Sequence, residues 1–289
     1  MAVLAHPGFV DRVSLARSAH WVLGLLLVLT SLASLTVGAT DAELLPALQK
    51  LAMGEELTRL ELIVLWDIRL PRLILGILVG ASLAVGGAVM QGLFRIPLAD
   101  PGLVGVSAGA GLGAIGAIVL VGYAPRWRAN FAGEQLVPIA AFFSGWATTI
   151  LLYRVATRRG RTSVATMLLA GIALGALAGA RSGILIYMAD DRQLRDLTFW
   201  HLGSLGGASW TKIMAAGPIM VAALVGACFL GRALNGLALG EATAAHIGIP
   251  IQRMKNGAIL AVAAASGAAV AVSGGIGFIG IVVPHLLRL

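Results

Sequence analysis

The sequence predicts an all-α membrane protein whose chain crosses the bilayer several times. Hydrophobic residues make up 58% of the 289 residues and charged residues only 12%, which is about half the charge of a typical soluble domain. The charges gather between uncharged apolar runs of about 20 residues, the length that an α-helix needs to cross a bilayer. Outer-membrane barrels show short alternating segments instead, so that class is excluded.

Eight apolar runs mark the expected spans. The first, residues 20–39, follows Arg12 and Arg17 and resembles a signal peptide. It is longer than a typical signal core, and we therefore expect an uncleaved helix. The whole chain, residues 1–289, is expected to form a single transmembrane domain. The other runs are residues 70–93, 101–123, 136–156, 164–188, 210–231, 256–273 and 276–288.

Arginine and lysine positions predict the orientation, because cytoplasmic loops are enriched in these residues. With the N-terminus inside, the inner side holds a small majority of them, including the tight group Arg158, Arg159 and Arg161. The outer loops hold fewer, among them Arg126 and Arg128. We therefore expect a cytoplasmic N-terminus. The net charge of +8 reflects this orientation, and nothing in the sequence suggests a nucleic-acid partner.

Glycine spacing indicates where helices pack closely. Residues four apart share a helix face, and glycine there lets a neighbouring backbone approach in lipid. The third run has such a row at Gly105, Gly109 and Gly113. For the fifth run, ordinary packing and a face towards a pathway or a moving interface both remain open. That run carries the longest row: Gly171, Gly175, Gly179 and Gly183.

Arg181 is the charged residue that lies within a run rather than at its end. An arginine inside the membrane is costly and normally faces a cavity, a partner or a pathway. No aspartate or glutamate lies within a run to pair with it. The side chain could extend to the outer surface, but we favour the alternative that it lines the route of an anionic substrate.

The sequence also argues against several kinds of chemistry. Without acidic residues inside the runs, it lacks the carboxylates that many ion-coupled transporters use. It has no Walker A motif, because its three lysines follow Gln49, Thr211 and Met254 rather than glycine. The lone Cys228 and the scattered histidines show no metal-ligand spacing. If transport is active, another polypeptide must supply the energy.

The inner-side connection at residues 232–255 is too polar to cross a membrane. It is expected to form two short helices, at 237–240 and 241–246, with Pro250 as a breaker. An ordered helix pair on the cytoplasmic face suits docking to a protein partner, whereas the alternative is a solvated loop.

Several motifs together resemble the permease subunit of type II ATP-binding-cassette importers, which bring in cobalamin, ferric siderophores and haem. They occur in the family's order and cover nearly the whole chain. The matching segments are RLPR at 69–72, GAVMQGLFRIPLADPGLVGVSAGAGLG at 87–113, LLAGIALGAL at 168–177, LALGEATAAHIGI at 237–249 and GGIGFIGIVVPHLLR at 274–288.

The resemblance implies two docking surfaces. Arg69 and Arg72 match outer arginines that pair with acidic residues on a periplasmic substrate-binding protein, where exposed charges steer and register docking. The cytoplasmic segment matches the coupling helices that sit in a cleft of the ATPase. Its candidate coupling residues are Leu239, Gly240, Glu241 and Gly248.

The resemblance also implies a path and a gate. The fifth span, with Gly175, Gly179 and Arg181, matches the helix that lines the path between two permease copies. Four positions match the family's cytoplasmic gate: Ile96, Leu98, Val164 and Ala165. All four are apolar here, although some relatives have polar residues at them.

The family implies the remaining partners and the location. We expect a homodimer in lipid of the bacterial inner membrane, joined by two ATPase subunits that bind ATP and Mg²⁺. The chain itself is expected to bind no cofactor and to have no enzyme activity. Relatives have ten spans, so we expect that the last two are missing from this chain.

Haem is the favoured substrate, because it carries two propionates and arginine binds carboxylates well. Ferric siderophore and cobalamin are the alternatives. Two other classes remain: an ion-coupled secondary transporter, and a membrane enzyme that would hold Mg²⁺ through Asp190, Asp191 and Asp196. These three aspartates lie beside arginines at the end of a span, and we expect a solvated, self-paired loop there.

Overall fold

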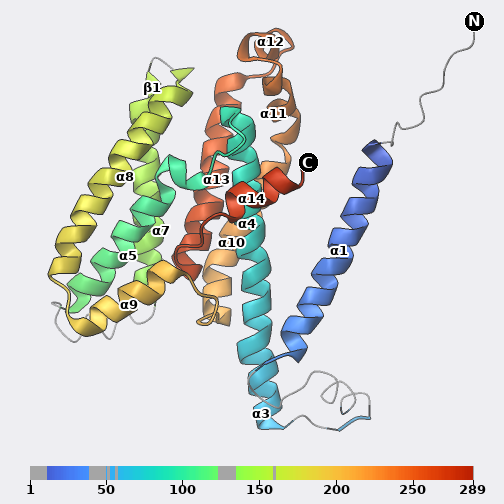
Figure 1. The fold of residues 1–289 in the computed structure, drawn as a ribbon, viewed down its shortest axis with the longest axis vertical. Helices are drawn as coiled ribbons and strands as arrows, with labels where there is room; N and C mark the ends of the chain where they lie inside the picture. Colours follow the sequence, from blue (N-terminus) through green and yellow to red (C-terminus); the bar gives the residue numbers. More distant parts are fainter. Residues whose placement is uncertain are drawn as a thin grey trace, which may run out of the picture. The chain divides into compact units, whose positions relative to one another are not determined.

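The computed structural model describes residues 12–38, 50, 53–55, 58–122, 135–158 and 161–288. These residues are nearly all helical (Figure 1), which confirms the expected all-α fold. Within the described ranges, the strands are β1 (Thr157–Arg158) and β2 (Arg161–Thr162), which form a short antiparallel hairpin. Arg126, Arg128 and Arg159, which were used to predict the orientation, lie outside the described residues.

The chain forms two compact units, Met1–Leu73 and Ile74–Leu289. The first contains α1 (Arg12–Thr36), α3 (Arg59–Leu62) and the π-helix η1 (Ile63–Arg69). A capping box starts α3: the Thr58 hydroxyl accepts a hydrogen bond from the Glu61 N–H at 3.3 Å, and the Glu61 carboxylate accepts one from the Thr58 N–H at 2.9 Å. This reciprocal pair satisfies two backbone donors at the helix start.

The second unit is a helical bundle around α13, the helix with the most buried residues along its length. α13 packs against α5, α7 and α10, and α5 also packs against α7 and α8. Helix α4 begins in the first unit and continues in the second. The elements are α4 (Leu70–Phe94), η2 (Pro101–Val104), α5 (Val106–Gly122), α7 (Leu136–Ala156), α8 (Val164–Tyr187), α9 (Asp191–Leu202), α10 (Trp210–Cys228), α11 (Gly231–Ala238), α12 (Glu241–His246), α13 (Ile251–Ser273) and α14 (Ile279–Leu286).

The two ends of the second unit carry different elements (Figure 1). The β1–β2 hairpin, α11 and α12 lie at one end, and α9 lies at the other. Arg158 of β1 and Arg161 of β2 therefore lie at the same end of this unit as α11 and α12.

Small residues set the distance between α5 and α7, as the glycine row of the third run predicts. A Cβ at Gly109 would overlap the Thr148 side chain, and a Cβ at Gly113 would overlap the Ala140 carbonyl. Another close approach joins α4 to α14, where a Cβ at Gly87 would overlap the Gly280 carbonyl. Glycine is therefore required at these positions for packing.

The described chain has six helices long and apolar enough to cross a membrane, where we expected eight. The 17-residue α5 is a shorter apolar helix. The expected span at 276–288 is wrong, because α14 has only eight residues and would rise about 12 Å. The backbone explains this: Gly274 and Phe278 have φ values of 74° and 66°, which break the helical path through the apolar run.

Two further expectations differ from the structure. The acidic stretch at 190–196 forms the start of α9 rather than a loop, and Asp190 caps this helix by accepting a hydrogen bond from the Gln193 N–H at 2.7 Å. The first of the two short cytoplasmic helices was expected at 237–240 but is α11, which ends at Ala238. The second, at 241–246, is confirmed as α12.

Candidate functional site

The two candidate docking arginines of the first unit have different surroundings. Arg69 is 7% exposed, whereas Arg72 is exposed. Nη1 of Arg69 donates hydrogen bonds to the carbonyls of Leu35 at 2.6 Å and Thr36 at 3.3 Å, at the end of α1. Such terminal carbonyls lack partners within their own helix, and a cation there also complements the helix dipole. Arg69 therefore holds the end of α1, and Arg72 is the more accessible of the pair.

Both arginines line a hollow of about 480 Å³ together with Ala33 of α1 and Val37, which follows the end of this helix. A Cβ at Gly38 would overlap the Arg69 guanidinium, so glycine leaves room for this side chain. The predicted docking arginines are thus brought together on one face of the first unit.

The candidate coupling residues lie on α12 and the turns that flank it. Gly240 and Gly248 have φ values of 115° and 83°, a backbone region that favours glycine. Leu239 is 69% exposed between α11 and α12, while Ala244 anchors α12 because its side chain is fully buried. The segment therefore has a fixed shape and offers an exposed apolar side chain, as a docking element would.

Glu241, at the start of α12, forms an ion pair with Lys255 of α13, with 2.8 Å between Oε1 and Nζ. The Glu241 side chain is 52% exposed, but that of Lys255 is 5% exposed. Nζ of Lys255 also donates to the backbone carbonyl of Thr162 in β2 at 3.1 Å. A buried ammonium needs such partners because its desolvation is costly.

The four candidate gate residues come from two segments of the second unit. Ile96 and Leu98, in the turn after α4, are 36% and 61% exposed. Val164 begins α8 and packs against the buried cluster of the bundle, while Ala165 is exposed. α8 packs against η2, the short helix that follows this turn.

The exposed face of α8 carries the candidate path residues. Gly179 and Arg181 are exposed, and Gly175 is half-buried. A Cβ at Gly179 or at Gly183 would meet no atom within 4 Å. These last two glycines of the α8 row therefore pack against nothing in the described chain. Neither ion pair found among the described residues includes Arg181. Large apolar side chains share this helix's exposed surface: Leu169, Ile172, Leu177 and Ile184.

A family model described as the FecCD transport family matches residues 26–289. The chain belongs to this family. The match includes both docking segments, the gate segments and α8, so the family covers every candidate site residue named above.

Curated relatives of this FecCD chain include permeases for two substrates. It is 43% identical over 224 residues to the hemin transport system permease protein HmuU of Yersinia pestis, covering 77% of this chain and 65% of that protein. It is 39% identical over 278 residues to the vitamin B12 import system permease protein BtuC of Salmonella typhi, covering 94% of this chain and 78% of that protein. The chain thus spans about two thirds to four fifths of these relatives' lengths.

The FecCD chain has the same fold as a solved structure. That structure is described as an inward-facing conformation of a metal-chelate type ABC transporter, and it superposes with a TM-score of 0.76 at 27% identity. The superposition covers 93% of this chain and 80% of that one.

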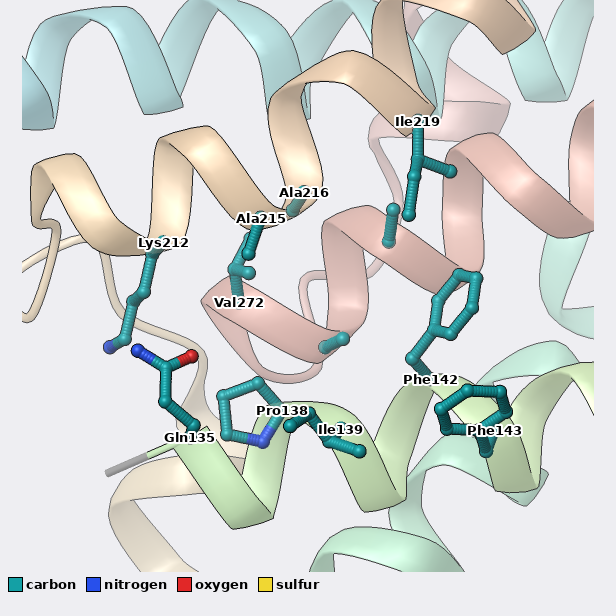
Figure 2. A pocket seen from close by; sticks show the side chains of 12 residues that line it. Gln135, Pro138, Ile139, Phe142, Phe143, Lys212, Ala215, Ala216, Ile219 and Val272 are labelled. Atoms are coloured by element: carbon teal, nitrogen blue, oxygen red, sulfur yellow. The ribbon is translucent and has the colours of Figure 1, made fainter. Parts of the chain in front are cut away.

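An apolar groove of about 220 Å³ lies between α7, α10 and α13 of the FecCD chain. Figure 2 shows Phe142, Phe143 and Ile219 towards one end and the polar side chains of Gln135 and Lys212 at the other. Sequence reasoning missed this groove, because its walls come from helices far apart in the chain.

Sequence reasoning also missed the partners of Lys255, which it used only as a charge on the inner side. One signal was available: Gln252, Lys255 and Asn256 follow Pro250 at helical spacing and so give the start of α13 one polar face. The contact with Thr162 has no local signal, since 93 residues separate the two.

Proposed function

We propose that this chain is the membrane-spanning permease subunit of an ATP-driven importer of the bacterial inner membrane, and that its substrate is haem. The observation that carries the proposal is the family match together with the 43% identity to a hemin permease. In this proposal each copy forms a single permease domain, and two copies form a homodimer. The N-terminus of each copy lies in the cytoplasm.

Two surfaces of the chain support the proposed partners. A periplasmic binding protein docks on the face that carries Arg69 and Arg72, and it contacts the accessible Arg72 while the buried Arg69 holds the end of α1. Two ATPase subunits dock on the coupling residues around Leu239 and Glu241. The chain is not an enzyme and binds no cofactor, because ATP and Mg²⁺ are held by the ATPase.

The exposed face of α8 supports a path between the two copies. A second copy packed against this face would place Gly175, Gly179 and Arg181 beside the substrate and cover the exposed apolar residues of α8. The gate is formed by Ile96 and Leu98 with Val164 and Ala165, at the inner end of the path.

Arg181 is the reason to prefer an anionic substrate. Its guanidinium is exposed on a helix inside the membrane, where an unpaired charge is costly. A propionate of haem would neutralise this charge through a charge-assisted hydrogen bond. We expect Arg181→Ala to lower haemin uptake about tenfold, the factor for one charged hydrogen bond, and Arg181→Lys to retain part of it. Unchanged uptake by Arg181→Ala, with docking and ATP hydrolysis intact, would remove this role.

Vitamin B12 is the second candidate, because the BtuC match covers 94% of this chain. A ferric siderophore is the third, since the similar solved structure is of metal-chelate type.

The test uses the complete complex in nanodiscs with its binding protein. ATP hydrolysis is measured with the binding protein presented empty, with haemin, with ferrichrome and with cyanocobalamin. We expect haemin to give the largest stimulation. If cyanocobalamin stimulates and haemin does not, the substrate is B12 and the haem assignment is wrong.

A further inference from the structure

The start of α13 holds two segments that are distant in sequence, the coupling helix α12 and the β2 end of the hairpin before α8. Lys255 lies between them and is 4% exposed. Its Nζ lies 2.8 Å from Glu241 Oε1 on α12 and 3.1 Å from the Thr162 carbonyl on β2. One buried ammonium therefore joins both segments.

Gln252, one helical turn before Lys255, forms hydrogen bonds with the same residue of β2, Thr162. Its Oε1 accepts a hydrogen bond from the Thr162 N–H at 3.2 Å, and its Nε2 donates to the Thr162 Oγ1 at 2.7 Å. With Lys255 on the carbonyl, both backbone polar groups and the hydroxyl of Thr162 are bound to α13. Thr162 is thus fixed to α13 more firmly than a single contact would achieve.

The hairpin is joined directly to α8. Ser163 follows Thr162 and caps α8 by accepting a hydrogen bond from the Thr166 N–H at 3.3 Å. Val164 and Ala165, the candidate gate residues of α8, are the next two residues in the chain. A displacement of Thr162 must therefore move the first turn of α8.

We propose that Lys255 is a positioning residue that transmits movement of α12 to the cytoplasmic gate at the start of α8. The proposal rests on the proposed function, in which the ATPase docks on the coupling residues of α12 and the turns beside it. If α12 shifts, Lys255 must either lose Glu241, leaving a buried ammonium poorly neutralised, or move with it and draw Thr162 along. Leaving a buried ammonium without its carboxylate partner is unfavourable, so the second course is preferred.

A purely structural role is the competing explanation, and a conservative variant separates the two. Lys255→Met keeps the length of the side chain and removes the ammonium, whereas Lys255→Arg keeps the charge. Lys50 offers a control, because it forms an ion pair with Glu61 at 2.7 Å in the other unit, although 35% of its side chain is exposed. Lys50→Met removes an ion pair that lies outside the relay, which is the series of contacts from Glu241 through Lys255 to Thr162.

The experiment places a fluorophore on the hairpin. Arg158, in β1, is exposed and is replaced by cysteine in a Cys228→Ser background, and the labelled permease is assembled with its ATPase in nanodiscs. ATP hydrolysis and the ATP-dependent change in emission are measured on the same sample, without any transport substrate. The readout is therefore independent of whether haem or B12 is carried.

We expect Lys255→Met to reduce the ATP-dependent emission change about fivefold or more, in line with coupling between sites, while ATP hydrolysis stays within about twofold. Lys255→Arg should restore most of the change, and Lys50→Met should leave it intact. If Lys255→Met does not assemble, Lys255→Gln decides, because it also removes the positive charge beside Glu241 but keeps a polar group at this buried position, and it should reduce the change as well.

An emission change that persists in Lys255→Met, or in Lys255→Gln where Lys255→Met does not assemble, would contradict the relay and leave the proposed function standing. So would a complex that hydrolyses ATP with no emission change before any relay residue is replaced. A permease that fails to assemble with an ATPase would instead contradict the proposed function, and the relay with it.

Discussion

Neighbouring arginines of one short motif have different roles because their surroundings differ. Arg69 is buried against the end of α1, where it binds the carbonyls of Leu35 and Thr36. Arg72, three positions on, is exposed. The motif alone treats both as docking residues, whereas their contacts separate a residue that holds a helix end from one that can meet a partner.

We expect Arg72→Glu to weaken association with the binding protein about fivefold, the upper range for an exposed ion pair. The loss should shrink as salt concentration rises, because exposed charges are screened. Surface plasmon resonance at two salt concentrations measures this. Arg69→Gln should chiefly lower the thermal unfolding temperature of the permease. Equal effects of both substitutions on docking, without a change in stability, would contradict the distinction.

Glycine positions that look alike in sequence also differ in their contacts. We expect Gly87→Ala to destabilise the permease by about 1–3 kcal/mol, as overpacking does, because its Cβ would overlap the Gly280 carbonyl. Gly80→Ala on the same helix is the control, since a Cβ there would meet no atom within 4 Å. Thermal unfolding in detergent compares the two. A Gly87→Ala variant as stable as Gly80→Ala would show that α14 does not pack here.

Among the elements, α11 and α12 form a pair whose geometry depends on Gly240. Its φ of 115° and ψ of 148° fall in a region that is essentially restricted to glycine. α12 itself has six residues, too few to be stable alone. The turn at Gly240 and the buried Ala244 therefore define how this helix is presented.

We expect Gly240→Ala to strain this turn by about 1–3 kcal/mol and to weaken ATPase binding. Gly231→Ala on α11 is the control, since its Cβ would meet no atom within 4 Å and its φ is ordinary. Co-purification of the ATPase with each variant measures the effect. If Gly240→Ala binds the ATPase as well as Gly231→Ala does, the coupling segment has been assigned wrongly.

The long helices of the bundle could be predicted from sequence because an apolar run of sufficient length is itself the physical requirement for a span. The same reasoning failed at α14, where the run is apolar but Gly274 and Phe278 turn the backbone away from a helix. It also failed at α9, whose charges suggested a loop although Asp190 and Gln193 form a capping box. The apolar composition of a segment indicates that it can lie in lipid, whereas caps and turns decide where a helix starts and ends.

At the scale of the whole molecule, the motifs predicted the candidate residues but not their contacts. Arg72, Leu239 and Arg181 are exposed, as residues awaiting partners should be, and their roles stay predictions. The burial of Arg69 and the link between Lys255 and Thr162 could not be predicted, because each depends on segments far apart in the chain. Such contacts arise only when the helices pack.

We expect this FecCD chain to import its substrate with energy from ATP that a partner hydrolyses. The most direct measurement is haemin uptake into proteoliposomes that hold the permease and its ATPase, with the loaded binding protein outside and ATP inside. We predict uptake that requires both ATP and the binding protein, and that stops when the catalytic glutamate of the ATPase is replaced. Uptake driven by a proton or sodium gradient without ATP would contradict the claim.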